Sequence, residues 1–215
     1  MALRMTKGEV PENAIALTRS EAIKYQWNQI HKWKPQREVW PFSYGVALLG
    51  GVAALSGVYI NMRIRKSLKL RSFGTAASAI TMSVCPGSLV CIAQLQMVTE
   101  KTFFPLESCP LCIEMRSIVV QNCGAIIYPM ILSPIVNFLI AKRDGRFRMP
   151  YYTNWKEMIY FCVNLFKPIV PSLGVLGAIN ALAAAVIVYK QFNCLSYIRE
   201  VLSVENESDE LQKDF

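Results

Sequence analysis

Four long stretches of this chain contain no Asp, Glu, Lys or Arg, and this pattern constrains the fold more than any other feature. The stretches are residues 39–62, 72–99, 117–141 and 168–189. A bilayer core about 30 Å thick requires about 20 mostly apolar residues of helix, so each stretch is long enough to span it. Helices also satisfy their own backbone hydrogen bonds in lipid. A soluble protein with four buried helices is the alternative, and it is disfavoured because soluble helices usually carry charge on one face.

The sequence therefore predicts an all-α fold, an integral membrane bundle of four transmembrane helices with an N-terminal amphipathic helix. Residues 1–40 are expected to form a polar segment with a short helix, and residues 191–215 an acidic C-terminal tail. The tail is polar from Ser203 to Phe215, which favours disorder there. The membrane domain occupies residues 41–190, with spans at about 41–62, 73–98, 117–141 and 169–189.

The N-terminal helix is predicted from Ser20 to Trp33. Thr18 and Glu21 have the spacing of a capping box, in which side chains satisfy the free amides of a first turn. Trp27 and Ile30 are among the apolar residues that predict partial burial of this helix, in one of two surroundings. The helix either lies on the membrane surface or packs on its own domain.

Small residues four apart in the first and last spans predict close helix packing. The pairs are Gly50 with Ala54, Ala53 with Gly57, and Gly174 with Ala178. Such spacing lets helices approach closely in lipid, but it does not identify the partner helix.

Prolines predict irregular helices in the second and third spans. Pro86 and Gly87 are expected to interrupt the second span, and Pro129 and Pro134 to kink the third.

The chain has a net charge of +8, and its basic residues lie beside the spans. This placement favours lipid headgroups over nucleic acid as their binding partner. The first loop carries five basic residues: Arg63, Arg65, Lys66, Lys69 and Arg71. The third loop carries Lys142, Arg143, Arg146, Arg148 and Lys156. Positive loops stay on the side from which insertion occurs. Both termini and the second loop are therefore expected on the opposite side, which is the intermembrane space in a mitochondrion.

Cys109 and Cys112 are the only group of neighbouring residues in the sequence whose side chains could take part in a reaction. Three readings remain open: a structural disulfide, which is favoured, a pair of free packing cysteines, and a redox pair. The five other cysteines are expected to be small packing groups: Cys85, Cys91, Cys123, Cys162 and Cys194.

The polar residues inside the spans are neutral, and hydrogen bonding between helices is their expected role. They are Gln94, Gln121, Asn122, Asn137 and Asn180. A transporter is disfavoured because no acidic or basic residue lies well inside a span. No phosphate-binding loop, metalloprotease motif or nucleophile elbow is present, so we expect no enzyme, no metal and no cofactor.

The second loop and third span contain a spaced motif, made of Phe104, Pro105, Leu106, Cys109, Cys112, Arg116, Tyr128 and Pro129. These residues and their spacing resemble the signature of the transmembrane protein 126 family. The resemblance is specific over residues 103–134 and diffuse elsewhere.

This resemblance implies a mitochondrial inner-membrane protein that assists assembly of respiratory complex I. It would be a non-enzymatic scaffold or chaperone for membrane-arm intermediates. The implied partners are complex I membrane-arm subunits, other intermediate assembly factors and inner-membrane lipid, including cardiolipin. Two alternatives remain, a permanent accessory subunit of a respiratory complex and a thiol redox protein.

Overall fold

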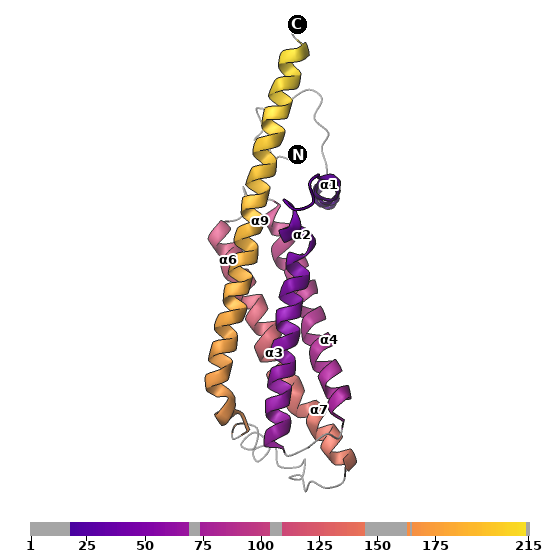
Figure 1. Ribbon diagram of the computed structural model, residues 1–215, viewed down its shortest axis with the longest axis vertical. Coiled ribbons are helices and arrows are strands. Elements are labelled where there is room, and N and C mark those ends of the chain that lie inside the picture. The colour runs from indigo at the N-terminus through magenta and orange to yellow at the C-terminus, as the bar shows by residue number, and fades with distance from the viewer. Residues whose placement is uncertain (1–17, 69–73, 104–108, 145–162, 164, 214–215) are drawn as a thin grey trace.

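The protein is a bundle of four long helical segments (Figure 1). The computed structural model describes residues 18–68, 74–103, 109–144, 163 and 165–213, and these residues form helices and no strand. The segments are α3 (Gly45–Ser67), α4 (Thr75–Gln94) with η1 (Leu95–Thr99) and α5 (Glu100–Thr102), α6 (Pro110–Asn122) with η2 (Cys123–Ile127) and α7 (Tyr128–Asp144), and η3 (Lys167–Ile169) with α9 (Val170–Lys213). All four are long and apolar enough to cross a membrane, which confirms the four-span prediction.

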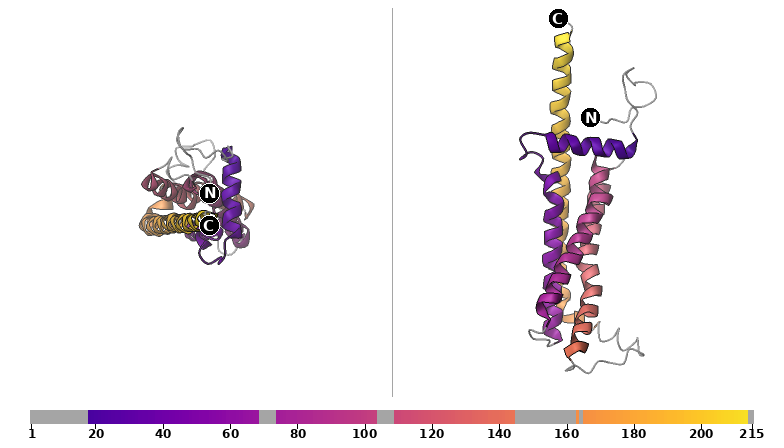
Figure 2. Two further views of the ribbon diagram at one scale, coloured as in Figure 1. Left: turned by 90° about the horizontal axis from the view of Figure 1, so that it is seen from above. Right: turned by 90° about the vertical axis from the view of Figure 1, so that its right-hand side faces the viewer.

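Helix α1 (Arg19–Lys32) lies across one end of the bundle, roughly perpendicular to the spans (Figure 2). The Thr18 amide donates to a Glu21 carboxylate oxygen at 2.9 Å, as the capping motif predicted. Trp27 packs edge-on against Phe103, and Ile30 joins the same apolar cluster with residues of α9. The helix therefore packs on its own domain, and its position at a membrane surface stays a prediction.

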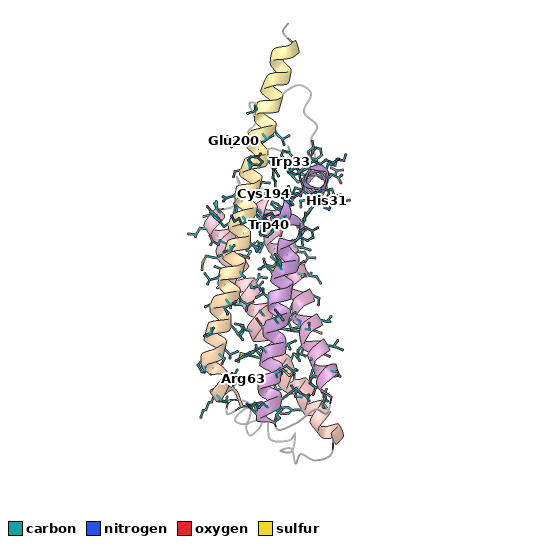
Figure 3. The ribbon with its side chains drawn as sticks, in the orientation of Figure 1. His31, Trp33, Trp40, Arg63, Cys194 and Glu200 are labelled. Carbon is teal, nitrogen blue, oxygen red and sulfur yellow. The ribbon has the colours of Figure 1, made fainter. Side chains whose placement is uncertain are left out.

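A short helix, α2 (Trp40–Ser43), leads from α1 into the first span. Its Phe42 stacks on Phe103 with ring centroids 5.4 Å apart, and Val39 beside it is fully buried. His31, Trp33 and Trp40 lie at one end of the bundle, and Arg63 lies at the opposite end (Figure 3).

Helix α9 is a single helix of 44 residues that continues beyond the bundle (Figure 1). The prediction of disorder from Ser203 is therefore wrong up to Lys213, and the helix crosses the predicted boundary at residue 190 without a break. Residues 203–213 contain no Pro or Gly, which would break a helix, and they include three Glu, a good helix former. Local propensity thus continues a helix that the membrane span has already nucleated.

The predicted interruption at Pro86 and Gly87 is also wrong, because α4 continues through both residues. In the third span a π-helical turn, η2, ends immediately before Tyr128 and Pro129. Since proline has no amide hydrogen to donate four residues back, a wider turn before it relieves the missing bond. Pro134 lies inside α7 and does not end it.

Candidate functional site

Glycines bring α3 and α4 into backbone contact. A Cβ built on Gly57 would collide with the Met82 carbonyl oxygen, and one built on Gly50 would lie 3.1 Å from the Gly87 carbonyl oxygen. A Cβ built on Gly87 would lie 3.4 Å from Cβ of Ala54. The predicted packing face of the first span is therefore used inside the bundle.

The corresponding face of α9 is open. Among the residues that the structure describes, nothing lies within 4 Å of a Cβ built on Gly174, and Ala178 one turn later is exposed. Gly177, three residues after Gly174, faces Asn122 and Ile126 of the third span. The two small-residue pairs that looked alike in the sequence thus have different environments.

Arg65 is buried among polar side chains near the first loop, with 4% of its surface exposed. Its guanidinium donates to Oγ of Ser78 at 3.1 Å, to Oδ1 of Asn137 at 3.2 Å and to Oγ1 of Thr75 at 3.0 Å. Sequence reasoning assigned Arg65 to the basic loop facing lipid headgroups, and it missed this role. The available signal was Asn61, one helical turn earlier on the same face.

Asn61 extends this cluster across three helices. Its Nδ2 donates to Ser78 at 3.1 Å, and its Oδ1 accepts from Nδ2 of Asn137 at 2.7 Å. Ser133 donates to the same Oδ1 at 3.3 Å. These bonds join α3, α4 and α7, and each is made away from water, where an unpaired polar group would be costly.

A second polar cluster lies in the middle of the bundle. Nε2 of Gln121 donates to Oδ1 of Asn180 at 2.9 Å and to the Leu49 carbonyl at 3.1 Å. Asn180 in turn donates to Oγ of Ser56 at 2.9 Å. The cluster joins α3, α6 and α9, and all three side chains are buried.

Gln94 makes a third polar contact between helices, with reciprocal bonds of 3.1 Å to the hydroxyl and carbonyl of Ser117. Gln94, Gln121, Asn137 and Asn180 therefore have the predicted interhelical role. Asn122 differs, because it donates to Ile118 of its own helix at 3.0 Å.

Cys109 and Cys112 lie at the start of α6, and both are exposed free thiols. Cys109 is the N-cap residue with an extended backbone, φ −58° and ψ 127°, and Pro110 begins the helix. The backbone N–H of Cys112, the Cys112 thiol and the backbone N–H of Leu111 favour the thiolate and lower the pKa of Cys109. Exposure does not fit packing cysteines, and a disulfide between the two stays a prediction.

The other described motif residues lie further along the third span. Arg116 is exposed one turn after Cys112, Tyr128 is half-buried, and Pro129 is buried at the start of α7. Phe104, Pro105 and Leu106 lie outside the described residues. Of the remaining cysteines, Cys194 is buried, Cys85 and Cys91 are half-buried, Cys123 is exposed, and Cys162 is outside the described residues.

Among the described residues, no three His, Cys, Asp or Glu side chains gather to hold a metal ion. The candidate functional features are thus the buried polar clusters, the open face of α9 and the exposed thiol pair.

Comparison with known proteins covers most of the chain. Residues 18–205 match the sequence model of the family described as Transmembrane protein 126. A Drosophila melanogaster protein named Transmembrane protein 126 is 36% identical over 185 residues, which cover 85% of this chain and 83% of that protein. No solved structure matches the chain significantly.

Proposed function

This chain belongs to the transmembrane protein 126 family, and from that membership we propose that it is a non-enzymatic assembly factor for respiratory complex I. It is a multi-pass membrane protein, and the proposed location is the mitochondrial inner membrane. The proposed task is to scaffold membrane-arm intermediates. The observation that carries this proposal is the open small-residue face of α9 at Gly174 and Ala178, on a bundle in which Gly50, Gly57 and Gly87 already meet a neighbouring helix.

A scaffold for unfinished membrane complexes must be stable both before its client arrives and after it leaves. The polar side chains inside the spans meet this requirement, because Arg65, Asn61, Gln121 and Asn180 all bond within the bundle. The outward side chains are largely apolar, including Leu55, Ile131 and Leu182. Most of these polar groups are therefore paired inside the bundle, and Oε1 of Gln121 and Oε1 of Gln191 are the buried side-chain amide oxygens of the described residues that have no partner.

The face of α9 around Gly174 and Ala178 is where a client helix is proposed to dock. In lipid there is little hydrophobic driving force between helices, so association depends on close van der Waals packing at small residues. An open glycine and an exposed alanine one turn apart allow such an approach. A contact of this kind is moderate in strength, which suits a factor that must dissociate when neighbouring subunits arrive.

The proposed orientation places α1 and the protruding end of α9 in the intermembrane space. Arg63 and Lys66 are exposed at the opposite end, as the positive-inside rule requires for a matrix-facing loop. The exposed basic residues at this end suit anionic headgroups such as cardiolipin.

The test is a native-gel and mass-spectrometry profile of mitochondria carrying a tagged copy. Co-migration with partial complex I intermediates, and absence from the finished enzyme, is the expected result. Co-migration with the finished complex would instead make the protein an accessory subunit. Migration apart from complex I in every fraction would overturn the proposal.

A further inference from the structure

We propose that Cys109 and Cys112 form a reversible redox site that exchanges with an accessible disulfide, of a protein or of glutathione. This reactivity goes beyond the scaffold role and does not depend on it. Cys109 is the attacking thiol, and Cys112 is the thiol that resolves the mixed disulfide.

The first argument is the placement of the pair. Cys109 is the N-cap residue of α6 and Cys112 lies in its first turn, so the Cys109 thiol lies beside the free backbone N–H groups of the helix start, and those of Cys112 and Leu111 favour its thiolate. These groups stabilise a thiolate, and they do so more for the capping thiol than for the one inside the turn. Both side chains are exposed, so a disulfide on another molecule can reach them.

The second argument is the rigidity of the platform beneath the thiols. Ile113 is 2% exposed and packs with Val98 and Val188, which belong to two other segments. One turn later, Ser117 is fully buried and bonded to Gln94. The buried side of α6 is thus fixed, and the two thiols are held on its open side.

The exchange proceeds in two balanced steps. The Cys109 thiolate attacks one sulfur of the substrate disulfide, whose S–S bond breaks, and the released thiolate takes up a proton. Cys112 then loses its proton to solvent, and its thiolate attacks the Cys109 sulfur of the mixed disulfide. The second substrate thiol leaves, so the pair is oxidised to a disulfide while the substrate disulfide is reduced to two thiols.

The backbone at the pair allows this closure. Cys109 has an extended backbone and only its carbonyl enters the helix, where it accepts from the Ile113 amide at 3.2 Å. Its side chain can therefore move onto Cys112 without breaking a bond inside the helix. Exposed pairs of this kind are the labile disulfides rather than the structural ones.

The experiment uses the purified full chain in phospholipid nanodiscs with glutathione disulfide as the probe. Cys112→Ser is expected to trap a glutathione adduct on Cys109, located by peptide mass spectrometry. The mirror variant Cys109→Ser is expected to react at Cys112 about tenfold more slowly, because a thiol outside the cap has less thiolate at neutral pH. Cys123→Ser, which removes an exposed thiol from the middle of a span, is the matched control and leaves the Cys109 adduct unchanged.

The unmodified chain is expected to form the Cys109–Cys112 disulfide and to reopen it with reduced glutathione. A disulfide-linked peptide is the second probe, and whichever probe reacts faster identifies a protein or a small molecule as the source. No adduct on Cys109, equal rates in the two serine variants, or a disulfide that reduced glutathione does not reopen would each overturn the proposal. The assay contains no complex I, so its result is independent of the assembly role.

Discussion

Gly57→Ala is expected to destabilise the bundle, because the added methyl group has no space between α3 and α4. Its Cβ would collide with the Met82 carbonyl oxygen and would lie 3.1 Å from Cγ of Pro86. The first of these is backbone, so no rotamer change removes the collision. The two helices must separate, and the Asn61–Ser78 bond of 3.1 Å one turn away must lengthen with them.

The magnitude follows from a matched variant on the same helix. Gly51→Ala adds the same methyl group where nothing lies within 4 Å. Replacing Gly by Ala favours a helix by up to about 1 kcal/mol, and this gain is common to both variants. Overpacking costs about 1–3 kcal/mol, so Gly57→Ala should be less stable than Gly51→Ala by about that amount.

The assay is reversible unfolding of each variant in mixed micelles, followed by helical circular dichroism at increasing denaturing detergent. Cross-linking between cysteines introduced on the facing sides of α3 and α4 would report the separation directly. Equal stability of Gly57→Ala and Gly51→Ala would refute the close approach of these two backbones.

Three further outcomes are expected. Arg65→Leu removes the donor to Thr75, Ser78 and Asn137 and should lower the stability of the bundle by about 1–3 kcal/mol. The control Arg63→Leu, at an exposed position, should change the stability by less than about 0.5 kcal/mol, and the same micelle titration measures both variants. Gly174→Leu combined with Ala178→Leu should leave bundle stability unchanged but reduce co-migration with complex I intermediates on native gels. Normal co-migration of this variant, or an equal loss of co-migration with the control Gly51→Leu, would show that α9 is not the docking face. Hydrogen bonds from the Thr18 side chain and backbone lower the pKa of Glu21 in the folded protein. The ionised Glu21 carboxylate therefore stabilises the α1 cap fully above pH 4.5, and this stabilisation is lost as the pH falls through the pKa of Glu21 in the folded state. The hydrogen-exchange protection factors of the first-turn amides of α1, which are relative to the intrinsic rate at each pH, should therefore fall in acid, and Thr18→Val should weaken that pH dependence.

The four spans were predictable because crossing a bilayer demands a property of consecutive residues, the absence of charge over about 20 positions. The ends of the helices were less predictable. Pro86 signals a break when read alone, yet α4 continues because its residues on both sides of Pro86 pack on α3. The tail after Ser203 reads as polar and disordered, yet it is attached to a long helix that extends into it.

Contacts between spans were not predictable from one sequence. Gly50 and Gly174 have the same spacing to a small neighbour, but only Gly50 meets another helix. Arg65 reads as a loop charge because the uncharged run ends at Met62, whereas its long side chain turns back into the bundle. The position of the thiol pair beside the third span was predictable, and the capping role of Cys109 required the structure.

The unbroken length of α9 has a mechanical consequence. At about 1.5 Å per residue, its 44 residues form a rod about 66 Å long. Gly174 lies near one end of this rod within the membrane, and the other end extends past α1 (Figure 1). A tilt of a few degrees imposed by a neighbour in the lipid would therefore displace the far end by several ångströms. A client docked on the proposed face at Gly174 and Ala178 would in this way move the far end of α9, where molecules in the aqueous compartment could bind it.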